Sequence, residues 1–262
     1  MISLIKFIFS FSLAHLCVAY IDTVPFNSNL KFSGRIVGGQ DVTDGLIPWQ
    51  VSLVHFGSHY CGGSIISPKT IVTAAHCLDT INKNFLKVRV GTKDRYGYGM
   101  LLQVEDFKLH ENFSRSTYHN DIALIYLRKR LQYVPYKIEP IALAEQNSFV
   151  KDGTMAMVSG WGVLRHNSNI VPKILQYVMV PVINREQCNR LMNNLVSERQ
   201  ICAGFLNGGK DACQQDSGGP LVYNKKLIGI VSWGDECGKP RRPGVYTDVG
   251  SLRNWIDKNI QL

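Results

Sequence analysis

After its first twenty residues, the sequence has no long apolar run. No later stretch reaches the roughly 18 apolar residues that a membrane-spanning helix requires, so we expect no membrane association. It also has no low-complexity tract and no short-period repeat. Charged residues form 19% of the chain and hydrophobic residues 45%, which is typical of a globular protein and excludes a disordered one. A chain of 262 residues suffices for one large domain or two small ones.

Motifs for metals and nucleic acids are missing as well. No pair of cysteines has zinc-finger spacing, and no DNA- or RNA-binding motif is present. The formal net charge is +9, with basic clusters at residues 128–130 and at Lys239, Arg241 and Arg242. An acidic glycan or nucleic acid is one explanation of these clusters, and ordinary solvated surface charge is the simpler one. We therefore expect no metal, no cofactor and no nucleic-acid partner.

The first segment has the pattern of a secretory signal. Lys6 precedes a mainly apolar run from Phe7 to Ala19, and small residues at Cys17 and Ala19 suit cleavage before Tyr20. We predict a signal peptide over residues 1–19 and a secreted, extracellular protein. Its removal leaves six of the seven cysteines. In an oxidising compartment an even set predicts disulfides, although six cysteines allow 15 pairings.

Short runs rich in Val, Ile and Tyr alternate with Gly, Pro and Asn, which is a strand-and-turn pattern. Such runs occupy residues 50–56, 70–76, 86–90, 121–127, 155–163, 175–183 and 226–234. Only two helices are indicated, near 184–194 and at 251–260. Because strands and helices do not alternate, a parallel α/β fold is disfavoured and an all-β fold is expected.

Three segments, TAAHC (73–77), NDIAL (120–124) and QDSGGP (215–220), combine a histidine, an aspartate and a serine. Each residue alone has an ordinary structural explanation, but their occurrence together indicates nucleophilic catalysis. A serine hydroxyl is a weak nucleophile and needs a neighbouring base. Histidine can take that proton and return it, because its pKa lies near neutrality. A carboxylate on the other ring nitrogen orients the imidazole.

Together with further motifs, these segments resemble the trypsin-like serine endopeptidases, in particular secreted arthropod and mite trypsins of the mite group 3 allergen type. The motifs are RIVGG (35–39), CGGSII (61–66), TAAHC, DIAL, SGWG (159–162), DSGGP, SWG (232–234) and PGVY (243–246). The resemblance covers essentially the whole chain from residue 36. It implies two antiparallel six-stranded β-barrels, at about 36–140 and 141–262, with a C-terminal helix.

Carried over residue by residue, the resemblance assigns Ser217 as nucleophile, His76 as general base and acid, and Asp121 as the group that orients His76. The backbone N–H groups of Gln215 and Ser217 would form the oxyanion hole. Asp211 matches the acidic floor of the pocket for the residue before the scissile bond, which implies cleavage after Arg or Lys. The other substrate-binding positions are Ser232, which also supports Asp121, and the open pocket walls at Gly234 and Gly244.

The resemblance also implies activation by cleavage. Arg35 and Ile36 would flank the cleaved bond, which makes residues 20–35 a propeptide, and the new Ile36 amine would pair with Asp216. The implied disulfides join Cys61 to Cys77, Cys188 to Cys202 and Cys213 to Cys237. The segment GTKDRYGYG (91–99) lacks the acidic ligands of the family's calcium loop, so no calcium is expected. Asn112 begins a glycosylation sequon.

Two family glycines are replaced near the site. Gln215 keeps its backbone N–H, but a side chain disfavours a glycine-like backbone angle, and it would also project toward the leaving-group side. Glu236 lies where the pocket mouth is expected. Two alternatives remain open there: Glu236 attracts a cationic substrate side chain, or it pairs with Arg241 or Arg242 and obstructs entry.

The sequence thus predicts a monomeric, zymogen-activated endopeptidase with protein or peptide substrates. Its expected partners are an activating trypsin-like protease and serine protease inhibitors. An alternative hypothesis is a catalytically impaired homologue that binds proteins as a decoy or inhibitor. A third is a basic, glycan-binding secreted protein. The intact triad and activation site favour the enzyme, with activity reduced by Gln215 and Glu236.

Overall fold

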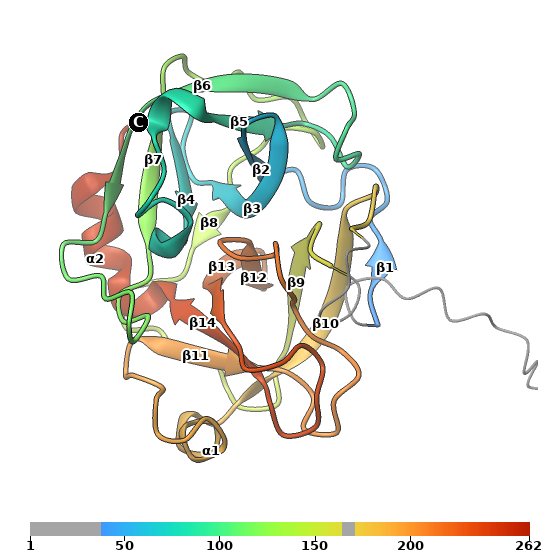
Figure 1. The fold of residues 1–262 in the computed structure, drawn as a ribbon, viewed down its shortest axis with the longest axis vertical. Helices are drawn as coiled ribbons and strands as arrows, with labels where there is room; N and C mark the ends of the chain where they lie inside the picture. Colours follow the sequence, from blue (N-terminus) through green and yellow to red (C-terminus); the bar gives the residue numbers. More distant parts are fainter. Residues whose placement is uncertain (1–37, 164–170) are drawn as a thin grey trace, which may run out of the picture. The chain divides into compact units, whose positions relative to one another are not determined.

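Short antiparallel strands dominate the structure and form two closed β-barrels, which confirms the predicted fold class (Figure 1). The computed structural model describes residues 38–163 and 171–262. All of these residues belong to one unit, Gly34–Leu262. The two expected helices are present as α1 (Arg185–Leu191) and α2 (Val249–Asn259). In the described ranges, no helix is long and apolar enough to cross a bilayer.

The first barrel closes in the order β2-β3-β4-β7-β6-β5. Its strands are β2 (Gln50–His55), β3 (Ser58–Ile65), β4 (Thr70–Thr73), β5 (Leu86–Val90), β6 (Met100–Leu109) and β7 (Ala123–Leu127). Two short 3₁₀ helices, η1 (Ala75–Cys77) and η2 (Lys83–Phe85), connect β4 to β5. β5 shows why the barrel forms, because Leu86, Val88 and Val90 are buried while the intervening Lys87 and Arg89 are partly exposed. This period of two sends alternate side chains into the barrel.

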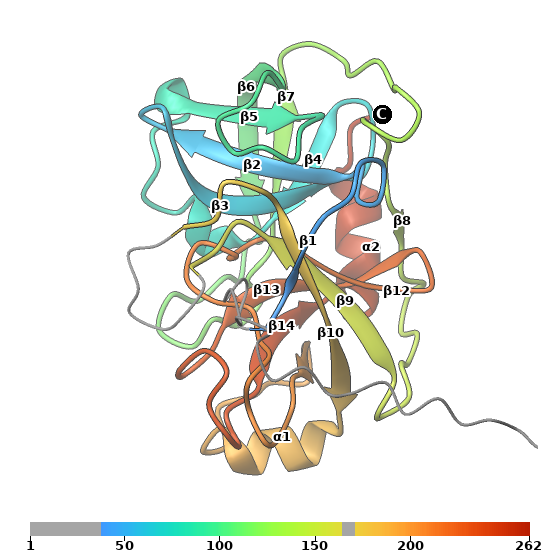
Figure 2. The ribbon, with the colours of Figure 1, turned by 90° about the vertical axis from the view of Figure 1, so that its right-hand side faces the viewer.

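The second barrel closes through β9-β10-β11-β14-β13-β12, with β12 pairing back to β9. Its strands are β9 (Met155–Gly160), β10 (Gln176–Ile183), β11 (Gln200–Ala203), β12 (Pro220–Tyr223), β13 (Lys226–Trp233) and β14 (Gly244–Asp248). Two short strands extend this sheet: β1 (Gln40–Asp41) pairs with β10, and β8 (Ala142–Leu143) pairs in parallel with β13. Figure 2 shows β1 lying against β10. The N-terminal strand therefore joins the second barrel's sheet and not the first.

The C-terminal helix α2 links the barrels. It begins where the Asp248 side chain caps the Ser251 N–H at 3.3 Å, a common N-terminal cap. At its other end, the Tyr126 hydroxyl of β7 donates to the Asn259 carbonyl at 2.9 Å, and Figure 1 shows α2 beside β7. All five residues of β7 are buried.

Hydrogen bonds join the two barrels, and they bring β3 of the first barrel against the Ser217 loop of the second. The Gly62 N–H of β3 donates to the Ser217 carbonyl at 2.7 Å, and a Cβ on Gly62 would lie 3.0 Å from the Cα of Gly219. Deeper in the interface, the buried Ser159 hydroxyl donates to Gln50 Oε1 at 2.7 Å. Glycine at residue 62 therefore allows the loop that carries Ser217 to approach the first barrel closely.

Candidate active site

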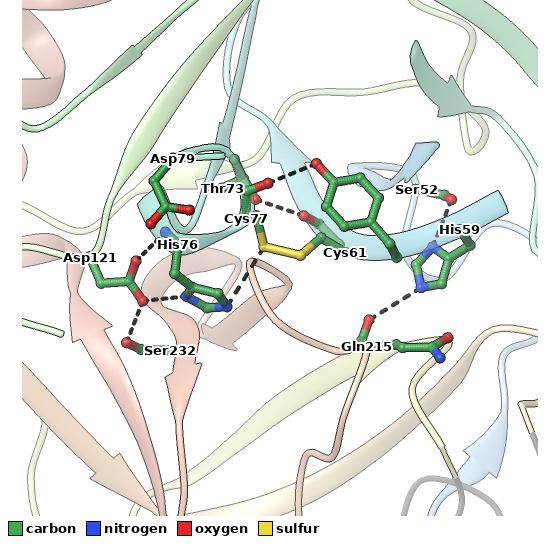
Figure 3. Close-up of a disulfide and its surroundings, with 12 residues drawn as sticks. Ser52, His59, Cys61, Thr73, His76, Cys77, Asp79, Asp121, Gln215 and Ser232 are labelled. Atoms are coloured by element: carbon green, nitrogen blue, oxygen red, sulfur yellow. Dashed lines mark hydrogen bonds and ion pairs between the residues drawn. A yellow bond between two sulfur atoms is a disulfide. The ribbon is translucent and has the colours of Figure 1, made fainter. Parts of the chain in front are cut away.

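His76 and Asp121 come from neighbouring strands of the first barrel. His76 lies on η1, directly after β4, and Asp121 lies just before β7, which pairs with β4. His76 Nδ1 is 2.7 Å from Asp121 Oδ2, and the His76 backbone N–H donates to Asp121 Oδ1 at 2.9 Å (Figure 3). A carboxylate only accepts hydrogen bonds, so Nδ1 carries the hydrogen and Nε2 is left able to accept a proton.

The second barrel completes the environment of Asp121, whose side chain is fully buried. The Ser232 hydroxyl of β13 donates to Asp121 Oδ2 at 2.6 Å, and the Thr247 hydroxyl of β14 donates to the Asp121 carbonyl at 2.7 Å. Hydrogen bonds of this kind compensate for the loss of water around a buried charge. Ser232 therefore acts on Asp121, as the resemblance implied, while also lining the cavity described below.

Ser217 lies in the loop before β12 and lines a cavity of about 300 Å³ together with His76. The cavity lies between the barrels, since His76 and Tyr118 come from the first and its other lining residues from the second. The next residue, Gly218, has φ +78°, and a Cβ there would lie 2.1 Å from the Thr73 hydroxyl. Only glycine fits this position, which fixes the turn that presents Ser217.

Gln215 adopts a left-handed, glycine-like backbone conformation, with φ +74°. A left-handed conformation at a non-glycine residue costs about 1–3 kcal/mol. Its N–H and that of Ser217 donate to no other described residue. The Gln215 side chain extends away from His76, on the side of His59 (Figure 3), and its Oε1 is buried without a partner among the described residues. Two unpaired N–H groups therefore lie in the loop that carries Ser217.

Asp211 lies in the same cavity and is only 4% exposed. Its Oδ2 accepts the Gly238 N–H at 3.1 Å, whereas its Oδ1 has no hydrogen-bond partner among the described residues. Burial raises the pKa of this carboxyl to about 7. A Cβ on Gly244 would lie 2.9 Å from Asp211 Oδ1, so a side chain there would obstruct the carboxylate. At Gly234, by contrast, a Cβ would meet no atom within 4 Å.

Asp216 is not among the residues that line this cavity and is completely buried. Its Oδ1 accepts the Gly162 N–H at 2.7 Å, and its Oδ2 accepts the Cys213 N–H at 2.9 Å. Burial raises its pKa to about 7, against the opposing effect of these two hydrogen bonds. A Cβ on Gly160 would lie 2.1 Å from Asp216 Oδ1. The absence of a side chain at Gly160 therefore leaves the space that the Asp216 carboxylate occupies.

The cavity mouth carries two acidic residues, Asp235 and Glu236. Glu236 forms an ion pair with Lys239. Arg242, which we considered as a partner of Glu236, lies 3.1 Å from Asp235 instead. An ion pair between partly exposed side chains contributes only about 0–1 kcal/mol to stability. The acidic residues are thus partly neutralised at the rim, and neither lies at the floor.

The structure has the three disulfides that the resemblance implied, Cys61–Cys77, Cys188–Cys202 and Cys213–Cys237, and the first and third lie at the site. The first anchors η1 and His76, and the third closes the loops around Asp211. Each small loop contributes about 3 kcal/mol in the chain-entropy model. In the described ranges, one group of residues has metal-like spacing, Cys61, His76 and Cys77. It is not a metal site, because its two cysteines are bonded to each other.

The remaining predicted residues have different outcomes. Asn112 is exposed between β6 and β7, and its glycosylation remains a prediction. The signal peptide, the propeptide, Arg35 and Ile36 lie outside the described residues. Sequence reasoning missed His59, Ser52 and Thr247, which act through one or two hydrogen bonds each and carry no motif. Tyr246 was visible within PGVY, but its buried, unpartnered hydroxyl has no signature in the sequence.

Comparisons with known proteins agree with this geometry. Residues 36–256 match the family model described as Trypsin. Trypsin delta of Drosophila melanogaster is 43% identical over 90% of this chain and 93% of its own length. Hypodermin-B of Hypoderma lineatum is 44% identical over 91% and 92%, and the vitellin-degrading protease of Bombyx mori is 43% identical over 86% of both chains. The chain therefore belongs to the trypsin family of serine proteases.

Proposed function

We propose that this protein is a secreted serine endopeptidase that hydrolyses peptide bonds after arginine or lysine. The observation that carries the proposal is the unpartnered, buried Oδ1 of Asp211, at the floor of the cavity that His76 and Ser217 also line. A guanidinium or ammonium group in this cavity would supply the hydrogen-bond donor that the carboxylate lacks. Membership of the trypsin family supports a protein substrate.

The hydrogen bond from His76 Nδ1 to Asp121 leaves His76 Nε2 able to act as the base in the proposed reaction. Ser217 Oγ attacks the carbonyl carbon of the scissile bond while His76 Nε2 takes its proton. The developing imidazolium is stabilised by Asp121, which already accepts from Nδ1. His76 then gives the proton to the leaving amine, the C–N bond breaks, and an acyl-enzyme remains on Ser217. Water attacks this ester, with His76 again as base, and releases the acid.

The negative charge that develops on the carbonyl oxygen needs donors. The N–H groups of Gln215 and Ser217 have no other described partner, so both are available to the oxyanion. Loss of one such donor lowers turnover about 10²–10³-fold. The conformation at Gln215 therefore bears directly on the rate.

Within the pocket, we expect arginine to be preferred over lysine. Ala212 lines the cavity next to Asp211 and has no hydroxyl to help hold a compact ammonium. A guanidinium has five donors in a planar fork, whereas an ammonium has three on a single atom. Arginine can therefore reach Asp211 Oδ1 and a second acceptor at once.

The proposal includes activation by cleavage between Arg35 and Ile36. Three observations support it: the family match begins at residue 36, Asp216 is a buried carboxylate without a cationic partner among the described residues, and burial raises its pKa. An amine brought to Asp216 would stabilise its charged form. A buried carboxylate is costly when it is unpaired and much less so when it is paired with a cation. The free energies of the unpaired and the paired forms of Asp216 would therefore differ strongly, which suits a switch.

Secretion is supported by the N-terminal signal pattern and by the three disulfides, which persist in oxidising compartments. The expected partners are a trypsin-like protease that cleaves after Arg35, protein substrates, and serine protease inhibitors that present a basic side chain. We expect the protein to act as a monomer.

The test uses the full chain, cleaved after Arg35 and verified by N-terminal sequencing. We expect labelling of Ser217 by a fluorophosphonate, and hydrolysis of an arginyl ester in preference to a lysyl and a phenylalanyl ester. Ser217→Ala should abolish labelling. Asp211→Asn should keep labelling and lose the preference for arginine. No labelling of the cleaved wild type would contradict the proposal and support the decoy hypothesis.

A further inference from the structure

The backbone carbonyl of His76 takes a hydrogen bond from outside η1. The N–H groups of Leu78 and Asp79, which follow His76, both donate to the Ala75 carbonyl. Carbonyl groups at the end of a helix have no partner inside it and need other donors. Arg115 Nη1 donates to the His76 carbonyl at 3.2 Å. A side chain from the loop between β6 and β7 therefore bonds the backbone of the proposed base.

Asp79 holds the guanidinium of Arg115 in this orientation. The same Nη1 atom lies 2.6 Å from both carboxylate oxygens of Asp79. The Asp79 side chain is 17% exposed, against 56% for that of Arg115, and hydrogen bonds between ionised partners are stronger than neutral ones. Figure 3 shows the Asp79 carboxylate near the His76 backbone, with the imidazole ring pointing the opposite way. Arg115 thus contacts the segment that carries His76 at two points.

The loop that carries Arg115 is hydrogen-bonded to the second barrel. Gln200, the first residue of β11, donates from Nε2 to the Tyr118 carbonyl at 3.1 Å. The preceding residue, Arg199, donates to Asn120 Oδ1 at 2.9 Å. The second barrel also carries the proposed nucleophile, in the loop before β12. Arg115 therefore connects η1 to a loop that is fixed on the nucleophile's barrel.

Arg115 and Tyr118 belong to one closed turn. The Ser114 N–H donates to the His119 carbonyl at 3.1 Å, and the Tyr118 N–H donates to the Ser114 carbonyl at 2.7 Å. The Tyr118 ring packs edge-on against the His76 ring, with 5.5 Å between the centroids. A shift of this turn would therefore act on the backbone and on the ring of His76 together.

We propose that Arg115, oriented by Asp79, is a positioning residue that fixes the backbone of His76 relative to the barrel that carries Ser217. The inference rests on the proposed peptidase function. Asp121 holds the N–H and the ring of His76, and Arg115 holds the carbonyl of the same residue. Proton transfer requires His76 Nε2 within hydrogen-bond reach of Ser217, so a small displacement of η1 should lower the rate of reaction.

The test compares two matched arginines in the full chain cleaved after Arg35. Arg253 of α2 has the same kind of contacts as Arg115, because it bonds both carboxylate oxygens of Asp257 at 2.8 and 2.9 Å and the Ala144 carbonyl at 3.1 Å. Arg115→Met should lower the rate constant of fluorophosphonate labelling and the kcat for an arginyl ester about 5–20-fold, less than the roughly 10²-fold cost of a 1 Å misplacement. Arg253→Met should change both by less than about twofold.

Two readouts separate positioning from a loss of folded protein. A small uncharged fluorophosphonate does not need the Asp211 pocket, so its rate constant reports on the reactivity of Ser217, whereas misfolding lowers only the amount labelled. Benzamidine, a cation that occupies the Asp211 pocket, should keep its Kd within about twofold in Arg115→Met. A smaller labelled amount with an unchanged rate constant, or equal losses in Arg115→Met and Arg253→Met, would overturn the inference.

Asp79→Asn provides a second variant that leaves Arg115 in place. An amide has one acceptor atom where the carboxylate has two, so the guanidinium should be held less firmly and the labelling rate constant should fall about two- to fivefold. In the Arg115→Met background the same change should have less than about a twofold effect, because residues in contact are coupled. An unchanged rate constant in Asp79→Asn, or an equal fall in both backgrounds, would overturn the inference.

Labelling of the cleaved wild type tests the peptidase function separately. If the wild type is labelled and Arg115→Met behaves like Arg253→Met, the inference alone fails. A wild type that is not labelled would contradict the peptidase function, and the inference with it.

Discussion

The carboxylate of Asp121 holds His76 at two points, through the ring Nδ1 at 2.7 Å and through the backbone N–H at 2.9 Å. The ring bond sets the tautomer, and the backbone bond fixes the position of η1 relative to β7. Orientation of the base thus depends on one fully buried side chain, and the second barrel hydrogen-bonds to that side chain through Ser232.

Asp121→Asn should therefore lower kcat on an arginyl ester by about 10⁴, the effect known for this change in related triads. An amide NH₂ would donate to Nδ1, leaving the hydrogen on Nε2, which then cannot accept from Ser217. Ser232→Ala is the matched control, because it leaves both His76 contacts in place. We expect a loss of about tenfold or less for that variant, and similar losses in the two variants would contradict the tautomer argument.

The raised pKa of Asp211 predicts that pocket binding depends on pH. Benzamidine is cationic throughout, and it binds the ionised carboxylate and displaces its proton. Because the pKa of the free pocket is about 7, the Kd of benzamidine should rise about tenfold for each pH unit below 7 and level off above it. Calorimetry in two buffers should show proton release near pH 6. Asp211→Asn should bind weakly at every pH, and a flat Kd in the wild type would refute the prediction.

Substitutions at Gln215 separate its conformational effect from its steric effect. Gln215→Gly removes both the left-handed strain and the side chain, whereas Gln215→Ala removes only the side chain. We expect the free energy of unfolding to rise by about 1 kcal/mol in the glycine variant and not in the alanine variant. Both variants should hydrolyse protein substrates faster, with smaller gains on small esters. Equal gains on proteins and esters would show that the side chain does not hinder the leaving group.

At the cavity mouth, the ion pair of Glu236 and Lys239 predicts opposite effects of two neutral substitutions. Lys239→Gln should lower the KM for an arginyl ester about two- to threefold, because it leaves the Glu236 charge uncompensated near an incoming cation. Glu236→Gln should raise KM by a similar factor. Both effects should fade at about 1 M salt, where the Debye length is about 3 Å. A lower KM in Glu236→Gln would instead mean that Glu236 obstructs entry.

Much of this site could be predicted because its side chains lie in contiguous motifs. TAAHC, NDIAL and DSGGP contain the residues that would carry out the chemistry, and the family resemblance already implied that Asp211 lies in a pocket next to the nucleophile. The partner of Glu236 could not be predicted in this way. Arg241, Arg242 and Lys239 are almost equally near in the sequence, and only the loop conformation selects Lys239.

The sequence by itself determined the family, the β architecture and the residue types at the site, since strand periodicity and motif spacing are properties of the chain alone. Only the tertiary structure decided whether Gln215 keeps a glycine-like conformation. The carbonyl groups of Gln215 and Gln214 accept hydrogen bonds from His59 and Val163, which lie 156 and 52 residues away from Gln215. Any residue type has a backbone carbonyl, so such contacts leave no signature in the sequence, and they exist only once both barrels have closed.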